Sequence, residues 1–370
     1  MEKAKKMKKP LKITLIVISV ILVLLIISAL VLPKTIAMSV YNEYFGIRYT
    51  SYEPTTWELS DFEGLSAEKH RFYSDKGQVI TAYLYSRERN RTKGIIVMAH
   101  GFGGGGHRSY MDVIDYFAKN GYLVFAYDAT GNDESEGDAV GGLPQGVIDL
   151  GYALDYIDDF SGYPILLWGH SWGGYSVCSV PAVYPEVKGI ISVSGFNQSL
   201  DMLEAEGRNI AGDAIDFVIP YLRKHEEKTF NEYAYMSGLQ SLTLTDAPVM
   251  IVHSADDKVV PIEISYDRYY EKFRDDERFT FIRYEDRGHN LILCSEDAIA
   301  YREEYNKKGD EWLQSIGGSE NLTPEMRAEY IETNFDMHKG NELDSELMEK
   351  MLEFYDECVK NNPKGSIKNA

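Results

Sequence analysis

The sequence has few cysteines and few basic residues. Its 370 residues include only three cysteines, Cys178, Cys294 and Cys358. Three cysteines cannot form a disulfide framework, so the fold must depend on a hydrophobic core. Lysine and arginine number 38 against 58 aspartate and glutamate residues, which gives a formal net charge of −20. Phosphate binding needs a basic surface, so this balance excludes nucleic acid as a partner.

Patterns for metal or nucleotide binding are also missing. No His, Cys and Asp residues occur together at metal-ligand spacing, and there is no phosphate loop of the Walker type. We therefore expect no metal and no cofactor. The composition is 44% hydrophobic and 26% charged residues, which is typical of a globular protein rather than of a disordered chain or a polytopic membrane protein.

One long hydrophobic run lies near the N-terminus. Residues 1–12 are rich in lysine, and the stretch Ile13–Leu32 that follows contains no charged residue. As a helix, this stretch would span about 30 Å, which matches the hydrocarbon core of a bilayer. A cleaved signal peptide is the alternative, but its apolar region is usually only about 7–15 residues long. We predict an uncleaved single-pass anchor over 13–32, preceded by a basic cytoplasmic tail over 1–12.

The lysines also predict the orientation of this anchor. They precede the apolar run, so the positive-inside rule places the N-terminus in the cytoplasm. The folded part of the chain is then expected on the extracytoplasmic side of the cell membrane. We assign 33–69 to a linker or N-terminal segment and 70–370 to the folded domain. That domain would contain an insertion over 195–245 and an extended C-terminal region over 300–370.

Past the linker, strand-like and helix-like segments alternate. Short β-branched and aromatic runs predict strands at Val79–Tyr85, Gly94–Ala99, Tyr122–Tyr127, Pro164–Trp168, Val187–Val193, Pro248–Val252 and Phe279–Tyr284. Segments with helical spacing lie between them, at Tyr110–Lys119, Gly146–Phe160 and Ile262–Phe273. This alternation predicts an α/β fold with a mostly parallel sheet and helices on both faces. The segment 195–245 interrupts it and resembles a helical insertion.

The most informative motif surrounds Ser171. Residues Gly169–Gly173 have the pattern G-x-S-x-G, and the apolar strand Pro164–Trp168 runs directly into them. The two glycines permit a tight strand-to-helix turn that a Cβ would obstruct, so the Ser171 hydroxyl stands clear of the sheet. The pentapeptide alone is a weak signal. Its position between a strand and a helix predicts a nucleophile rather than a glycine-rich turn.

A nucleophilic serine needs a base, and the base needs an acid that orients it. His289 follows the predicted strand Phe279–Tyr284, on a loop at the same edge of the sheet as Ser171. The segment His253–Pro261 follows another strand and contains the acids Asp256 and Asp257. The chain order of serine, aspartate and histidine fits a nucleophile on a strand-to-helix turn.

Two further histidines, His100 and His170, flank glycines near this site, and we interpret them as loop-packing residues. Four others have no such setting and are expected on the surface: His70, His107, His225 and His338.

Negative charge that develops on a substrate oxygen needs backbone N–H donors aimed at it. One donor is expected to be Trp172, which immediately follows the nucleophile. The other is expected to be Phe102, in the glycine-rich segment after the strand Gly94–Ala99, because flanking glycines let the backbone approach a substrate. Phe102 and Trp172 are therefore the predicted oxyanion hole.

These residues resemble the α/β-hydrolase superfamily, in particular bacterial serine hydrolases of the esterase, monoacylglycerol-lipase and serine-aminopeptidase-like group. The resemblance covers roughly residues 70–300 and rests on six motifs: His100–Gly104, Asp128–Gly131 with Ser135, Gly169–Gly173, Tyr184–Gly189, His253–Pro261 and Gly288–His289. The resemblance implies a catalytic triad of Ser171, Asp257 and His289, because the family's acid lies four residues after the histidine that corresponds to His253. It also implies that 195–245 is a cap over the site.

The chain departs from the family pattern at three positions. Ser254 replaces a usual glycine, and Asp133 stands where a second glycine is common. Pro181 falls within the expected helix after the nucleophile and is expected to shorten or kink it. None of these residues belongs to the triad, so the departures bear on the substrate rather than on catalysis.

The sequence thus predicts a membrane-anchored serine hydrolase that forms an acyl-enzyme. Its partners would be the membrane and a small acyl ester or a short peptide, with an ester preferred. A serine peptidase or aminopeptidase of the same fold is one alternative, and a non-catalytic binding protein is another. The segment Gly101–Gly106 with Asp128 also imitates a dinucleotide-binding fingerprint. A dinucleotide-binding function would give no role to Ser171, Asp257 and His289.

Overall fold

A computed structural model describes residues 18–19, 22, 31–88, 92–158 and 162–361. Its centre is an eight-stranded sheet with the strand order β1-β2-β4-β3-β5-β6-β7-β8. The strands are β1 (Leu65–Tyr73), β2 (Val79–Arg87), β3 (Ile95–Ala99), β4 (Leu123–Tyr127), β5 (Ile165–His170), β6 (Ile190–Val193), β7 (Val249–Ser254) and β8 (Phe279–Tyr284). β2 runs antiparallel to both of its neighbours, and β3 to β8 are parallel. The predicted α/β fold with a mostly parallel sheet is confirmed.

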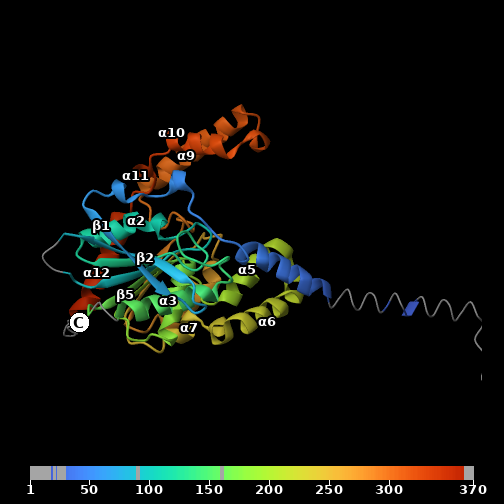
Figure 1. Cartoon of the computed structure of the whole chain (residues 1–370), viewed down its shortest axis with the longest axis horizontal. Helices are drawn as coiled ribbons and strands as arrows, with labels where there is room; N and C mark the ends of the chain where they lie inside the picture. The colour runs from blue at the N-terminus through green and yellow to red at the C-terminus, as the bar shows by residue number, and fades with distance from the viewer. Residues whose placement is uncertain (1–17, 20–21, 23–30, 89–91, 159–161, 362–370) are drawn as a thin grey trace, which may run out of the picture.

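Helices cover both faces of the sheet, and the alternation of side chains along the strands explains why. In β3, Ile95, Val97 and Ala99 pack into one core, whereas Ile96 and Met98 pack into the other. Helices α2 (Met111–Lys119) and α12 (Ser345–Asn361) cover the face of Ile96. The opposite face is covered by α3 (Pro144–Asp158), α4 (Trp172–Ser179) and α8 (Tyr266–Phe273). Figure 1 shows the sheet with helices on both of its faces.

Pro181 ends the nucleophile helix early, as its sequence position indicates. Helix α4 stops at Ser179, and a single 3-10 turn, Val180–Ala182, carries the proline. A proline inside a helix removes one backbone hydrogen bond and clashes with the preceding turn. The segment 195–245 folds into α5 (Ser199–Ala211), α6 (Ile219–Phe230) and the short α7 (Gly238–Ser241).

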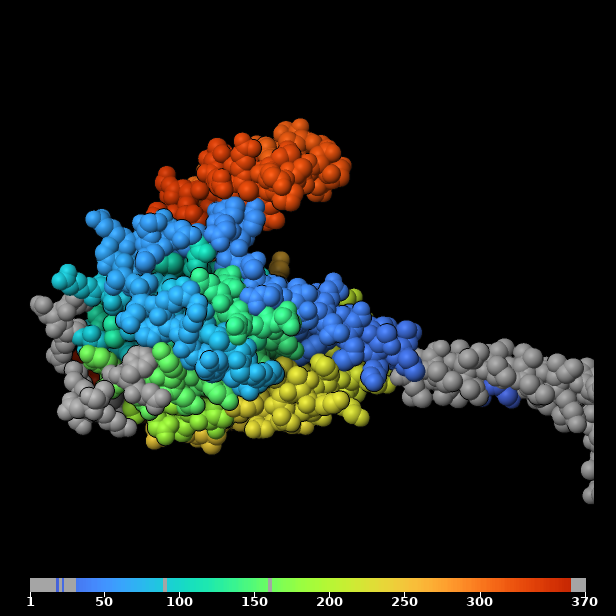
Figure 2. Space-filling view, viewed as in Figure 1, coloured from blue at the N-terminus to red at the C-terminus, as the bar shows by residue number. Residues whose placement is uncertain are grey.

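The C-terminal region contains an arm that the sequence pattern left unassigned. Helices α9 (Glu296–Ser315), α10 (Pro324–Asn334) and α11 (Met337–Gly340) project from the body of the molecule (Figures 1 and 2). The arm is held together by aromatic contacts, with Trp312 stacked on Tyr330 at 4.2 Å. Arg327 also lies over the ring of Tyr52, so the arm contacts the segment before β1.

The segment 33–69 is more than a linker. Residues 31–45 form a helix, here called the N-terminal helix, and Ala37, Tyr41 and Phe45 on one side of it are buried in the main core. Tyr41 also donates a hydrogen bond of 3.3 Å to the buried carboxyl group of Glu226 in α6. The i, i+4, i+8 spacing of the three apolar residues places them on one face of the helix, which is why it packs against the cap.

The predicted anchor, Ile13–Leu32, lies largely outside the described residues. Within the part of the chain that the structure does describe, no helix is both long enough and apolar enough to cross a bilayer. The anchor therefore stays a prediction.

The packing of the N-terminal helix should contribute measurably to the free energy of unfolding. Phe45 is 5% exposed, whereas its neighbour Tyr44 is 40% exposed. Replacing Phe45 with Ala should lower the free energy of unfolding by about 3–5 kcal/mol, because the substitution leaves a cavity in the core. Tyr44→Ala is the matched control and should cost far less. Urea unfolding of a chain trimmed to residues 31–370 measures both values, and equal costs would contradict this packing.

Candidate active site

Ser171 occupies the sharp turn between β5 and α4. Its backbone has φ +56 and ψ −115, a left-handed conformation that a serine rarely adopts. The turn brings α4 against β3 so closely that a Cβ on Gly173 would lie 1.9 Å from the carbonyl oxygen of Ala99. The glycine in the motif is therefore required by a backbone contact, and the serine is held in a strained position by packing around it.

The three predicted triad residues form one hydrogen-bonded chain. His289 Nε2 lies 2.9 Å from Ser171 Oγ, and His289 Nδ1 lies 2.7 Å from Asp257 Oδ2. His289 is 8% exposed and Asp257 is 6% exposed. With Nδ1–H donating to the carboxylate, Nε2 is free to accept the serine proton. This geometry can activate the Ser171 hydroxyl as a nucleophile.

The environment of Asp257 keeps it ionised. Burial raises the pKa of this carboxyl group, but the hydrogen bond and the charge of His289, together with the backbone N–H of Val260, lower it more. The net pKa lies below its ordinary value. Asp257 Oδ1 accepts hydrogen bonds from the backbone of Val259 and Val260, at 2.9 and 2.8 Å. These bonds fix the orientation of the carboxylate toward His289.

The neighbouring Asp256 has a different task. Its Oδ1 accepts hydrogen bonds from Ser254 Oγ at 2.6 Å and from Gly288 N at 2.8 Å. Ser254 Oγ in turn accepts a bond of 2.9 Å from the backbone of Arg287. The serine that replaces a usual family glycine therefore ties the acid loop to the loop that carries His289.

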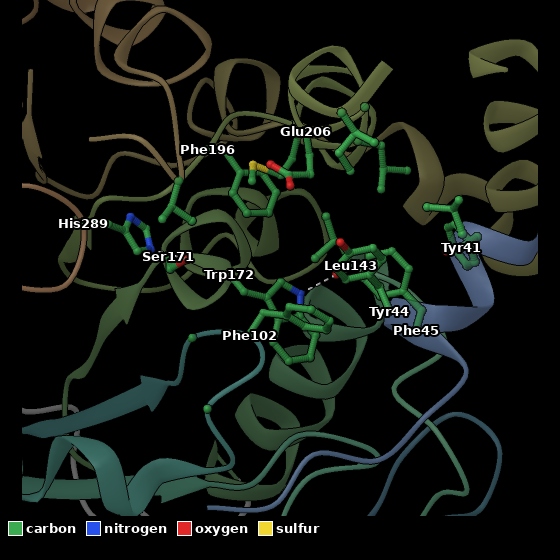
Figure 3. Close-up of a pocket in the computed structure, with 18 of the residues that line it drawn as sticks. Tyr41, Tyr44, Phe45, Phe102, Leu143, Ser171, Trp172, Phe196, Glu206 and His289 are labelled. Atoms are coloured by element: carbon green, nitrogen blue, oxygen red, sulfur yellow. Dashed lines mark hydrogen bonds between the residues drawn. The ribbon is translucent and has the colours of Figure 1, made fainter. Parts of the chain in front are cut away.

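Phe102 and Trp172, the predicted oxyanion residues, lie beside Ser171 at the pocket that contains it. Trp172 is the first residue of α4, where backbone N–H groups have no partner within the helix. The two side chains meet edge to face, with ring centroids 5.8 Å apart. Trp172 also donates from Nε1 to the carbonyl oxygen of Leu143 at 2.7 Å (Figure 3).

The glycine-rich loop that carries Phe102 is held by two aspartates. Asp133 accepts a hydrogen bond of 2.7 Å from Gly106 N and has φ +31, a conformation that explains why a glycine is common at this position. Asp128 accepts from His107 N at 3.0 Å and contacts His107 Nδ1 at 2.7 Å. The prediction that His107 lies on the surface was wrong, because it is buried between Asp128 and Tyr85.

His170 links the glycine-rich loop to the base. Its Nδ1 lies 2.9 Å from the hydroxyl of Tyr110, which accepts a bond from Gly101 N, and its Nε2 lies 3.1 Å from the carbonyl oxygen of His289. Burial, followed by the neighbouring His289, lowers the pKa of His170 to about 3. His170 is therefore neutral, and with the hydrogen on Nε2 it can serve both bonds at once.

A pocket of about 790 Å³ extends from the triad to the N-terminal helix. Figure 3 shows Ser171 and His289 at one end and Tyr41 and Tyr44 at the other. The cap and the N-terminal helix supply most of its walls, which are largely apolar. Its apolar lining includes Ile36, Ala37, Val40, Phe45, Leu143, Phe196, Met202, Leu203, Ile210, Ile215, Val218 and Leu222.

Comparison with known proteins agrees with the fold. The family model described as "Serine aminopeptidase, S33" matches residues 90–231, which is less than half of the chain and includes Ser171 but neither Asp257 nor His289. An esterase of Pyrococcus furiosus aligns in structure with a TM-score of 0.50 at 16% identity, covering 70% of this chain and 94% of that chain. The chain therefore has the α/β-hydrolase fold.

Two further comparisons are informative. An acetyl xylan esterase of a Paenibacillus species aligns with a TM-score of 0.51 at 16% identity, covering 69% of this chain and 86% of that chain. The quorum-quenching protein AidA of Acinetobacter baumannii is 29% identical over 131 residues. That match covers 33% of this chain and 43% of AidA, so the chain matches less than half the length of this relative.

The cap segment 195–245 presents some of its apolar side chains to the pocket and turns others away. Ile215, Val218 and Leu222 line the pocket. Phe217, in the 3-10 segment Gly212–Phe217, points outward and is 73% exposed, whereas Ile219 is buried in the core. Phe217 and Ile219 both lie outside the pocket lining.

Sequence reasoning missed the N-terminal helix as a wall of the site. The signal was present in the spacing of Ala37, Tyr41 and Phe45, but the segment was assigned to a linker or N-terminal segment.

In the described residues, no group of three or more His, Cys, Asp or Glu side chains is placed to hold a metal ion.

A kinetic test should distinguish the roles of Asp256 and Asp257. Asp257→Asn should lower kcat for ester hydrolysis by about 10⁴-fold, since other triads lose this much when the orienting carboxylate becomes an amide. Asp256→Asn should cost far less, because its bonds hold a loop rather than the imidazole. Steady-state rates of both variants on a chromogenic short-chain ester measure this, and a larger loss at Asp256 would refute the assignment.

Proposed function

We propose that this chain is a serine hydrolase that cleaves carboxylic esters through an acyl-enzyme. The observation that carries the proposal is the hydrogen-bonded chain from Ser171 through His289 to Asp257 at the end of an apolar pocket. A pocket of this size and polarity suits an acyl chain, and polar groups at one end suit the scissile bond.

The reaction would follow from the geometry in two halves. Ser171 Oγ attacks the ester carbonyl carbon while His289 Nε2 accepts the hydroxyl proton. The backbone N–H groups of Phe102 and Trp172 stabilise the resulting oxyanion. The tetrahedral intermediate collapses, and the alcohol leaves with the proton from His289. Water then attacks the acyl-enzyme with His289 as base, releasing the acid and restoring the serine. Asp257 stabilises the imidazolium in both halves.

The preference for an ester over a peptide rests on the pocket. Its walls are apolar around Ser171, and the related structures named above are esterases. The matched family carries an aminopeptidase description, and one carboxylate, Glu206 of α5, does line the pocket. A carboxylate in that position could bind the free amino group of a peptide. Aminopeptidase activity is therefore the second candidate function.

We also propose that the protein is held in the cell membrane by residues 13–32, with the hydrolase domain on the extracytoplasmic side. Support comes from the sequence alone, through the length of the apolar run and the lysines before it.

Removal of the nucleophile tests the proposed function directly. Ser171→Ala should lower ester turnover by about 10⁴–10⁶-fold while the fold is retained. It should also abolish covalent labelling by a fluorophosphonate, which reacts with activated serines. Turnover and labelling that match those of the parent would exclude Ser171, and a parent that shows neither would favour a non-catalytic binding protein.

Glu206 separates the two candidate functions. Its neighbour Glu204 pairs with Arg208 at 2.9 Å and does not line the pocket, so Glu204→Gln is the matched control. If the enzyme is an esterase, the parent should hydrolyse short acyl esters faster than aminoacyl amides, and Glu206→Gln should not lower that ester rate. If it is an aminopeptidase, the amide rate should exceed the ester rate and Glu206→Gln should lower it on the order of 100-fold, by loss of the charge pair.

A further inference from the structure

The N-terminal helix has two roles in the same few turns. Ile36, Val40 and Tyr44 line the pocket, and Ala37 and Tyr41 both line it and pack into the core. The described helix begins at residue 31, within the last residues of the predicted anchor. A wall of the pocket is therefore continuous in sequence with the segment that would enter the bilayer.

Exposed apolar side chains gather where this helix meets the cap. Ile36 is 45% exposed, Val40 is 41% exposed and Ile210 of α5 is 62% exposed, and all three line the pocket. Figures 1 and 2 show the N-terminal helix beside α5 and α6 at one end of the molecule, away from α12. The mouth patch is defined as these three residues with three exposed apolar residues that lie within five positions of a pocket-lining residue in the chain: Val31, Leu32, Ile36, Val40, Ile210 and Phe217.

The helix geometry fixes how far the mouth patch lies from the anchor. Ile36 follows Leu32 by four residues, which is about 6 Å along a helix, and Val40 follows by about 12 Å. The headgroup layer on each side of a bilayer is roughly 5–8 Å thick. If the run that ends at Leu32 crosses the hydrocarbon core, Ile36 lies at the level of the headgroups and Val40 lies just outside them.

We propose that the mouth patch rests on the bilayer that holds the chain's own anchor, and that esters dissolved in this bilayer enter the pocket directly from it. The inference rests on the proposed ester hydrolysis and on the anchor over 13–32. The bilayer is favoured over a second copy of the chain because the mouth patch begins where the apolar run ends. An apolar patch beside a membrane-entering helix also has the chemistry of an interfacial contact.

The charge of the protein and of the pocket lining indicates which class of lipid ester the pocket can accept. The formal net charge of −20 disfavours anionic headgroups at the protein surface, and the two charged groups of the pocket lining, Glu206 and Lys258, are of opposite sign. The ester that fits is a neutral lipid ester with a long acyl chain, whose apolar part matches the lining of the pocket.

A spacer between anchor and helix tests the inference. About twelve Gly/Ser residues inserted between Leu32 and Pro33 would separate anchor and pocket by roughly 19 Å on average. Intact protein is reconstituted into phosphatidylcholine vesicles and assayed with two esters. p-Nitrophenyl butyrate reaches the site from water, and methylumbelliferyl oleate is dissolved in the bilayer. The ratio of the oleate rate to the butyrate rate should fall about tenfold in the spacer variant.

A point substitution tests the role of the mouth patch without moving the predicted anchor. Phe217→Ser should lower the same ratio severalfold, whereas Leu244→Ser, which removes a side chain of similar exposure (59%) between α7 and β7, should leave the ratio unchanged. A ratio that is unaffected by both the spacer and Phe217→Ser would overturn the inference. If the spacer variant hydrolyses neither ester, the oleate-to-butyrate ratios of Phe217→Ser and Leu244→Ser alone decide whether the inference holds.

The failure of this inference differs from failure of the proposed function. If the parent hydrolyses neither ester, the esterase proposal fails. If the parent hydrolyses butyrate but not bilayer-dissolved oleate, or if its ratio equals that of both the spacer variant and Phe217→Ser, ester hydrolysis stands and entry from the bilayer is wrong.

Discussion

The parallel pairing of β3, β5, β7 and β8 within one sheet is the constraint on which the site depends. Parallel strands end at the same edge, so the loops that follow them meet there. Those loops carry Phe102, Ser171, Asp257 and His289, residues that are far apart in the sequence. The hydrogen bonds of 2.7 and 2.9 Å at His289 exist only because each strand stops in register with its neighbours.

Rigid support around this edge comes from buried polar groups rather than from the reacting residues themselves. Asp128 and Asp133 hold the glycine-rich loop, and Asp256 holds the histidine loop. Neutral His170 joins the two through Tyr110 and the backbone of His289. Buried polar networks of this kind hold one arrangement because every donor has a partner and an alternative would leave some unpaired. A strained serine turn needs such support.

The shape of the pocket, in contrast, depends on elements outside the sheet. Most of the pocket wall comes from the cap and the N-terminal helix, which are joined by hydrogen bonds to Glu226. Tyr41 and Ser199 both hydrogen-bond this carboxyl group, and burial raises its pKa to about 7. The same wall therefore joins the predicted anchor to the catalytic edge. This arrangement connects where the protein would be held with what it would hydrolyse.

The sequence by itself determined strands β2 to β8, the turn at Ser171 and the chain order of the three predicted triad residues, whereas it did not indicate β1. The strands and the turn follow from local rules: side chains that alternate along strands and glycines where backbones touch. The choice of Asp257 follows from the family resemblance. Only the tertiary structure decided that the N-terminal helix walls the pocket, that Phe217 faces outward and that His107 is buried. Each of those outcomes depends on which surfaces meet across the fold, and an amphipathic pattern shows that a face is buried without showing what it is buried against.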